Sequence, residues 1–142
     1  MMAPPTTDGT VLVVEPDPTA RSCIEECIAA SFGTRYQVIS AATRQAAYLQ
    51  LDRLHPRLVI LETDLPDGDG LDLIRYAHHE LAPSPTVVVC SHRRGVPEKI
   101  AALRAGADDY VVKPLQPERM ALKFQLLERF HQLTASSSLR PQ

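Results

Sequence analysis

Residues 58–61 form an uninterrupted apolar run (Leu-Val-Ile-Leu) that is typical of a β-strand buried on both faces. The run ends at Glu62, and residues 63–70 form a segment rich in Asp, Gly and Pro, which indicates a loop. Residues 71–75 then follow a helical pattern. A strand covered on both faces needs helices above and below its sheet, so this segment predicts an α/β fold with Glu62 at the carboxyl end of a parallel strand.

The same alternation of strand and helix occurs five times along the chain. Further strands are predicted at residues 11–14, 36–40, 87–90 and 110–112, and helices at residues 20–32, 43–54, 70–81, 97–105 and 117–133. Asp17 is expected to cap the first helix and Thr43 the second. This alternation predicts a parallel, doubly wound sheet with right-handed crossovers.

The length of 142 residues suits one domain with one core. We place that domain at residues 10–134, after a disordered lead at residues 1–9 and before a flexible tail or linker start at residues 135–142. The lead has no apolar core of a signal peptide, and no apolar run is long enough to span a bilayer. We therefore expect a cytoplasmic protein without a membrane partner.

Composition argues against direct contact with nucleic acid. The net charge is −2, and aromatic residues make up only 5% of the chain, so neither a basic footprint nor a base-stacking surface is expected. Cys23 and Cys27 lie one helical turn apart and could form a metal or redox pair, but small buried apolar residues are the favoured interpretation.

Polar residues follow the predicted strands at the edge where parallel strands converge. Glu15 and Asp17 follow the first strand, and Glu62 follows the third. Ser91 follows the fourth strand and Lys113 follows the fifth. Carboxylates can hold Mg²⁺, a hydroxyl and an ammonium can bind phosphate oxygens, and an aspartate can accept a phosphoryl group. The edge therefore carries the groups of a phosphoryl-transfer site.

From about residue 10 to residue 133, the sequence resembles the receiver domain of two-component response regulators. The matching segments are residues 11–15, 58–61, 65–70 and 105–114, and the interval from Ser91 to Lys113 also fits. The resemblance implies a flavodoxin-like, five-stranded parallel sheet in the order 2-1-3-4-5, with two helices on one face and three on the other. It also implies a role in phosphorelay signalling with a histidine kinase or an output protein as partner.

Carried over by position, the resemblance assigns roles to four residues. Lys113 would pair with the phosphoryl group or its acceptor, and Pro114 would form the cis peptide bond that follows it. Ser91 would be the hydroxyl that closes on the phosphoryl group, and Tyr110 would be the aromatic rotamer switch.

Three departures from the family pattern concern the chemistry itself. Glu62 stands where the family has its phosphate-accepting aspartate, and its extra methylene moves the carboxylate off the attack position. Pro16 replaces the second acid of the pair that begins with Glu15, and Asp17 comes one residue late. His92 replaces a small residue and should narrow the entrance. A Mg²⁺ site made of Glu15, Asp17 and Glu62 is therefore expected to be weak or lost.

Together these departures predict a pseudo-receiver: a non-enzymatic signalling module that keeps the fold, has no required cofactor and does not carry out phosphotransfer. The alternative is a working receiver that accepts a phosphoryl group on Asp64 or Glu62 with weakened Mg²⁺ binding. Glu62 and Lys113 could equally form a structural ion pair. A nucleotide- or flavin-binding module is disfavoured, because residues 16–18 replace the glycine-rich loop it would need.

The last predicted helix has more apolar residues than one buried stripe requires. Met120, Phe124 and Leu127 are expected to face the core. The remaining apolar residues form a candidate partner surface: Leu122, Leu126, Phe130 and Leu133. In the family, the region of the fourth helix, fifth strand and fifth helix serves dimers and output contacts, so a homodimer is possible; a helix that merely covers the sheet edge is the alternative.

Overall fold

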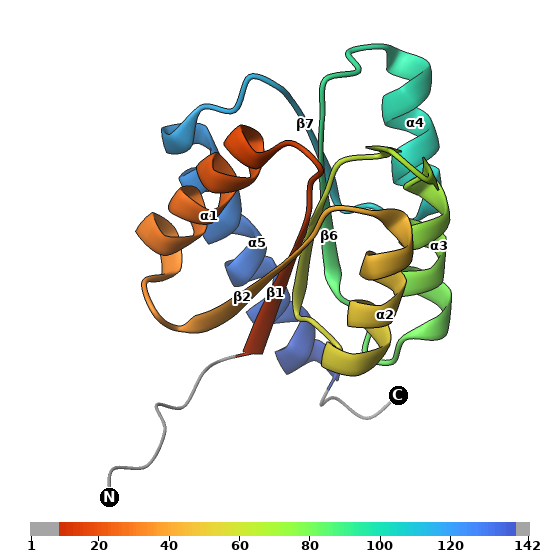
Figure 1. Ribbon diagram of the computed structural model, residues 1–142. Helices are drawn as coiled ribbons and strands as arrows, with labels where there is room; N and C mark the ends of the chain where they lie inside the picture. The colour runs from red at the N-terminus through yellow and green to blue at the C-terminus, as the bar shows by residue number, and fades with distance from the viewer. Residues whose placement is uncertain (1–8, 139–142) are drawn as a thin grey trace, which may run out of the picture.

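A central parallel sheet organises the computed structural model, which describes residues 9–138 and the side chains of residues 9–129 (Figure 1). The sheet consists of β1 (Gly9–Val14), β2 (Tyr36–Ala41), β3 (Leu58–Leu61), β6 (Thr86–Ser91) and β7 (Asp109–Val112). Its order is β2-β1-β3-β6-β7, and all neighbours pair in parallel. When only the strands of this sheet are counted, this is the expected order 2-1-3-4-5, which is thereby confirmed.

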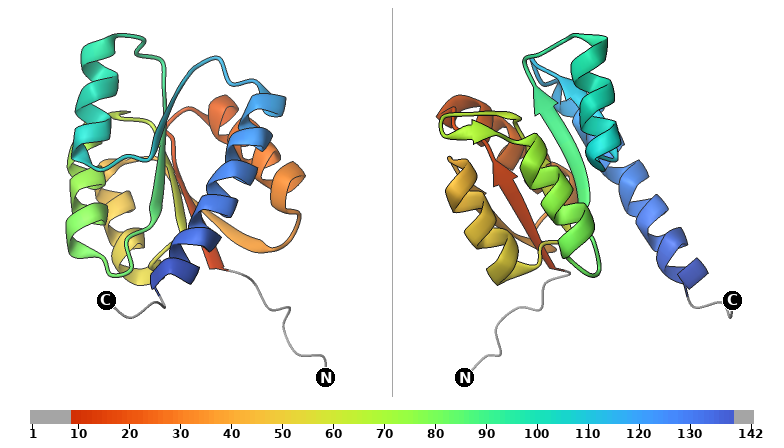
Figure 2. Two further views of the ribbon diagram at one scale, coloured as in Figure 1. Left: turned by 180° about the vertical axis from the view of Figure 1, so that it is seen from behind. Right: turned by 90° about the vertical axis from the view of Figure 1, so that its right-hand side faces the viewer.

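The helices that flank the sheet are α1 (Pro18–Phe32), α2 (Arg44–Leu54), α3 (Leu71–Glu80), α4 (Val96–Ala105) and α5 (Pro117–Ser138). Helices α1 and α5 cover one face of the sheet, and α2, α3 and α4 cover the other (Figures 1 and 2). Because side chains alternate along a strand, Val11 and Val13 pack toward α1 and α5, whereas Leu12 and Val14 pack toward α2, α3 and α4. The fully apolar strands thus supply two cores.

The loop predicted after β3 contains a small antiparallel hairpin that the sequence did not indicate. Its strands are β4 (Asp64–Leu65) and β5 (Gly68–Asp69). Asp67, at the hairpin turn, accepts hydrogen bonds from the backbone N–H groups of Arg44 (2.7 Å) and Gln45 (3.0 Å). The hairpin is therefore tied to the start of α2, where unpaired N–H groups favour a carboxylate.

Helix starts agree with the expected caps, but one helix end differs. Asp17 accepts from Ala20 N (2.9 Å) and Thr43 accepts from Ala46 N (3.1 Å), so both predicted N-caps are confirmed. Helix α5 ends at Ser138 rather than at the expected residue 133, so the first residues of the expected tail are helical. No Gly or Pro lies between Glu118 and Ser138, and the helix meets no residue that would stop it.

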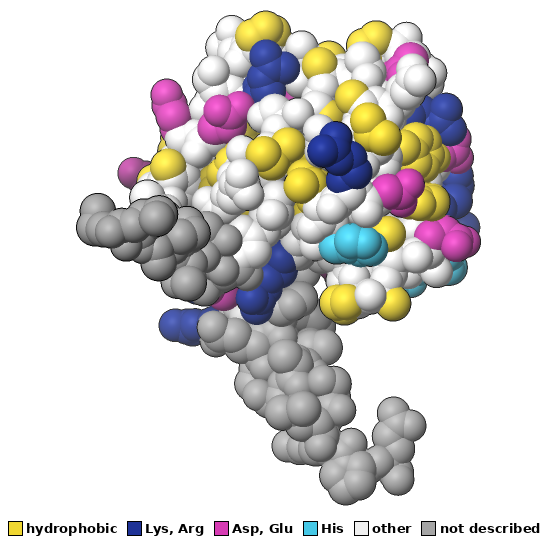
Figure 3. All heavy atoms as spheres, turned by 60° about the horizontal axis from the view of Figure 1, so that its bottom comes forward, with side chains coloured by type: hydrophobic (Ala, Val, Ile, Leu, Met, Phe, Trp, Pro, Cys, Tyr) yellow, Lys and Arg dark blue, Asp and Glu magenta, His cyan; other side chains and the backbone are white. Residues whose placement is uncertain are grey.

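The face at the amino ends of the strands lies opposite the carboxyl ends that carry the predicted site. Acidic, basic and hydrophobic side chains are interspersed on this face (Figure 3). Strand β1 begins at this end of the sheet, and α5 ends at it (Figure 1). Within residues 9–138, no helix has the length and apolarity needed to cross a bilayer.

Candidate functional site

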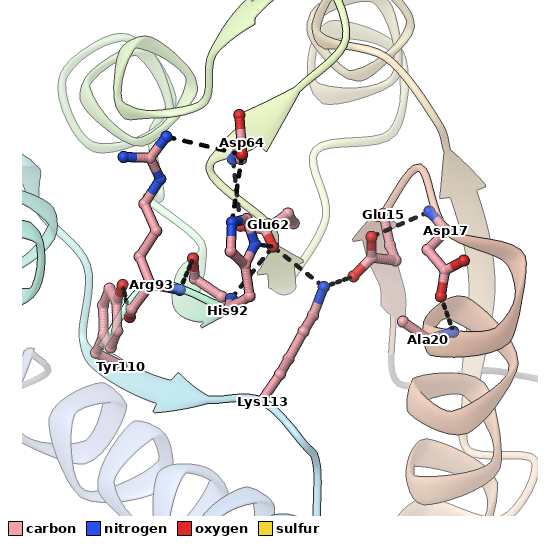
Figure 4. Close-up of polar contacts among 10 residues, drawn as sticks. Glu15, Asp17, Ala20, Glu62, Asp64, His92, Arg93, Tyr110 and Lys113 are labelled. Atoms are coloured by element: carbon pink, nitrogen blue, oxygen red, sulfur yellow. Dashed lines mark hydrogen bonds and ion pairs between the residues drawn. The ribbon is translucent and has the colours of Figure 1, made fainter. Parts of the chain in front are cut away.

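The carboxyl ends of β1, β3 and β7 bring Glu15, Glu62 and Lys113 into one polar network (Figure 4). The Lys113 ammonium donates to a Glu15 carboxylate oxygen and lies 3.1 Å from Glu62 Oε1. Glu15 is 1% exposed and Glu62 is 3% exposed, so two carboxylates share one cation in a site largely removed from water. The structure thus brings together three of the residues that the sequence placed at this edge.

Backbone pairing of the strands fixes the positions of these three residues. Each lies one residue past the end of its strand, and its N–H still joins the ladder: Glu15 to Ala41 O (3.0 Å), Glu62 to Val14 O (2.9 Å) and Lys113 to Ser91 O (2.8 Å). Their side chains therefore project from a rigid sheet edge. The Lys113–Pro114 peptide bond is cis, as the resemblance implies.

The network holds both partners of the central ion pair in their charged forms. Burial by itself raises the pKa of Glu62, but the Asp64 N–H, His92 and the Lys113 charge outweigh burial and lower that pKa below its usual value. Burial likewise disfavours the Lys113 ammonium, yet the neighbouring Glu15 and Glu62 raise the pKa of Lys113. Lys113 therefore keeps its positive charge between the two carboxylates.

The residues expected to hold Mg²⁺ do not form a ligand set in this arrangement. Asp17 uses its carboxylate to cap α1, and its backbone N–H donates to Glu15 Oε2 (3.1 Å). Pro16 has no side-chain oxygen, and a cation placed between Glu15 and Glu62 would have to displace the Lys113 ammonium. Among the described residues, no three His, Cys, Asp or Glu side chains are grouped to hold a metal ion. Mg²⁺ does not fit these residues as they stand.

His92 lies over the Glu62 carboxylate on the solvent side. Its Nδ1 is 3.1 Å from Glu62 Oε1, and its Nε2 is 3.4 Å from Asp64 Oδ2. Asp64 also donates its backbone N–H to Glu62 Oε2 (3.2 Å). The sequence placed His92 at the entrance but gave no sign of its pairing with Asp64, because that pairing depends on the path of the hairpin.

Ser91 and Tyr110 are both linked to the backbone of Arg93. Ser91 is fully buried, and its Oγ accepts from Arg93 N (3.1 Å). The Tyr110 ring is buried, and its hydroxyl donates to Arg93 O (2.7 Å). Among the described residues, the Ser91 hydroxyl makes no hydrogen bond to Glu62. The two predicted switch residues thus meet at Arg93 rather than at the Glu62 carboxylate.

Comparison with known proteins assigns the chain to a family. The family model of the response regulator receiver domain matches residues 11–125. This chain belongs to the response regulator receiver family. The receiver shares 35% identity over 126 residues with KdpE, the KDP operon transcriptional regulatory protein of Escherichia coli K12, covering 89% of this chain and 54% of KdpE. The receiver spans about half the length of the curated relatives it matches.

Solved structures give the same fold. The BeF3-activated N-terminal receiver domain of RstA from Klebsiella pneumoniae is 26% identical, with a TM-score of 0.68, covering 82% of this chain and 96% of that one. A CheY-like receiver domain protein from Methanospirillum hungatei is 23% identical, with a TM-score of 0.74, covering 90% and 98%. The second similarity shows the fold alone.

Helix α5 of the receiver separates its apolar residues largely as predicted. Met120 and Phe124 are buried and Leu127 packs against them, whereas Leu122 and Leu126 are 57% and 54% exposed. Phe130 and Leu133, the other two residues of the candidate partner surface, lie outside the residues whose side chains are described. Their place on that surface stays a prediction.

Helix α4 presents a second apolar stripe that the sequence analysis missed. Val96, Ile100 and Leu103 are exposed, whereas Ala102 and Ala105 face the core. The spacing of one and two turns was visible in the sequence, but large apolar residues on a helix ordinarily face inward. Only the packing shows that small alanines occupy the inner face here.

Proposed function

We propose that this chain is a receiver module that signals through protein–protein contacts and does not accept a phosphoryl group on Glu62. The observation that carries this proposal is the state of the Glu62 carboxylate. One of its oxygens contacts Lys113 and His92, and the other accepts from the Asp64 N–H. A nucleophile must be free and aligned with the phosphoryl group, and this carboxylate is committed to three partners.

The proposed loss of Mg²⁺ binding follows from the same network. Phosphoryl transfer needs cations that neutralise charge on the transferring oxygens. Pro16 and Asp17 offer no free side-chain ligand beside Glu15, and Lys113 neutralises the two buried carboxylates in part. We propose that no cofactor is required and that the module is not an enzyme.

Incubation with acetyl phosphate and Mg²⁺, followed by intact-protein mass spectrometry, tests the proposal. We expect no phosphoryl adduct on the wild-type chain. The double variant Pro16→Asp with Glu62→Asp is the matched positive control, because it restores the family's acid pair and acceptor. A stable adduct mapped to Glu62 would overturn the proposal.

The alternative is a working receiver that takes its phosphoryl group from a histidine kinase. Asp64 favours it, since this aspartate lies beside the site with a side chain that is 48% exposed. An adduct that is lost in Asp64→Asn would support this alternative. Mg²⁺-dependent NMR shifts at Glu15 and Glu62 would support it further, and their absence would support the contact-signalling module.

The proposed partner is another signalling protein, either a histidine kinase or an output protein, met in the cytoplasm. KdpE is named as a transcriptional regulator, but the matched region covers only about half of it, so direct contact with nucleic acid is not part of the proposal. A homodimer through α4, β7 and α5 is the proposed self-contact, because exposed apolar residues lie on both helices.

A further inference from the structure

Arg93 contacts residues of three strands, β4, β6 and β7, through three different groups (Figure 4). Its backbone N–H donates to Ser91 Oγ (3.1 Å), and its carbonyl accepts from the Tyr110 hydroxyl (2.7 Å). Its guanidinium Nη2 lies 3.7 Å from Asp64 Oδ2 in the hairpin after β3. A movement of Arg93 would therefore alter the hydrogen bonds of Ser91 and Tyr110 together.

The Asp64 carboxylate holds two successive residues of the loop after β6. It contacts Arg93 and, at 3.4 Å, His92 Nε2. We propose that Asp64 is a positioning residue: its side chain latches this loop and thereby keeps Ser91 and Tyr110 in their observed positions. The inference deepens the proposed function and rests on it, because it names how a contact at the surface reaches the two switch residues without a phosphoryl group.

The contact between Asp64 and Arg93 is accessible to a partner protein. The side chains of Asp64 and Arg93 are 48% and 50% exposed, and both line a cleft of about 420 Å³ between the hairpin and α4. Pro97 and Glu98 line the α4 side of this cleft. A partner whose charged side chain pairs with Arg93 or Asp64 would release the loop, together with the beginning of α4.

The variant Asp64→Asn tests the latch, because it removes the charge and keeps the size of the side chain. The Arg93 amide donates to a buried hydroxyl, so its hydrogen exchange reports opening of the loop. We expect exchange at Arg93 to rise about two- to fivefold, the effect of losing a half-exposed ion pair. In protein labelled with 3-fluorotyrosine, the ¹⁹F signal of Tyr110 should shift, while those of Tyr36, Tyr48 and Tyr76 stay in place.

Asp69→Asn is the matched control. Asp69 lies opposite Asp64 in the backbone register of the hairpin and lines the same cleft. Its Oδ1, however, accepts a hydrogen bond from Leu71 N. We expect wild-type exchange at Arg93 in this variant. If Asp64→Asn leaves the Arg93 amide and the Tyr110 signal unchanged, or if Asp69→Asn changes them equally, the inference is wrong.

A double-variant cycle shows whether Asp64 acts through Arg93. If it does, Asp64→Asn should add little to the Tyr110 shift already caused by Arg93→Ala. Full additivity would overturn the latch. All measurements use the unphosphorylated, Mg²⁺-free chain, so they remain decisive whatever the acetyl phosphate experiment shows.

Discussion

At the scale of single residues, Lys113 decides the chemistry of the site. One ammonium group, 18% exposed, serves two carboxylates that are almost fully buried. A buried charge that loses its partner costs much more than a surface ion pair contributes. The network is therefore expected to stabilise the strand ends only while all three residues are present.

Lys113→Met should lower the free energy of unfolding by about 3 kcal/mol, because it leaves Glu15 and Glu62 without their cation. Urea unfolding measures the effect. The double variant Lys113→Met with Glu62→Gln should recover part of the loss, since one uncompensated charge is gone. If Lys113→Met alone is as stable as wild type, the contacts of Lys113 with Glu15 and Glu62 do not stabilise the fold.

Glu62 should make stability fall in acid. Burial opposes its ionisation, but the hydrogen bonds and Lys113 together lower the folded-state pKa below the ordinary value of 4.5. Between these two values the unfolded chain binds more protons, so stability rises with pH there. The contribution of Glu62 is fully present above about pH 4.5 and is lost as the pH falls through the folded-state pKa.

Urea midpoints measured from about pH 6 to about pH 3 check this expectation. Glu62→Gln should show a shallower loss of stability in acid than wild type. Equal slopes for the two proteins would mean that Glu62 titrates alike in the folded and unfolded states.

At the scale of elements, the start of α1 shows how a cap and a metal ligand can be told apart. Asp17 lies next to the family's acid pair, but its carboxylate accepts from Ala20 N at 2.9 Å. Pro18 at the first helical position supports the same start. The Asp17 carboxylate thus points toward the first turn of α1, because the unpaired N–H groups there need an acceptor.

Asp17→Ala should destabilise the chain by about 1 kcal/mol through loss of the cap, as measured by urea unfolding. Asp17→Asn should be nearly neutral, because asparagine caps a helix about as well as aspartate. If Asp17→Asn costs as much as Asp17→Ala, the carboxylate has a role that depends on its charge, and the cap is not its main function.

At the scale of the whole molecule, most of the exposed large apolar side chains that the structure describes lie on α4 and α5. Leu122 and Leu126 on α5 lie within the region proposed for self-contact, and α4 adds its own apolar stripe. Leu49 on α2 is 57% exposed, as is Leu122, but α2 packs near β1 and β2, at the opposite edge of the sheet from β7. The two leucines therefore form a matched pair for testing the proposed dimer.

Leu122→Asp should weaken self-association at least about tenfold, because a leucine buried at an interface contributes about 1.5–3 kcal/mol. Leu49→Asp should leave it unchanged. Sedimentation equilibrium of the two variants and wild type measures the difference. A wild-type chain that stays monomeric, or equal effects of the two variants, would contradict the proposed homodimer.

Sequence reasoning located the sheet, its order and most of the site, but not the contacts between loops. The strands and the two helix caps could be predicted because apolar runs and the capping residues Asp17 and Thr43 act through local preference. The positions of Ser91 and Lys113 could be predicted because their interval fits the family pattern. The hairpin at 64–69, the inward alanines of α4 and the meeting of Ser91 and Tyr110 at Arg93 were missed. These features depend on segments that are distant in the chain.

The apolar runs and the polar residues that follow them were enough to predict that a parallel sheet carries Glu15, Glu62 and Lys113 to one edge. The contacts of Lys113 with both carboxylates, and those of Asp64 with His92 and Arg93, became evident only in the folded chain. Strand positions can be predicted because they follow from local hydrogen bonding and apolar burial. The pairing of charges depends on ångström-scale distances that are fixed only when all the strand ends are assembled.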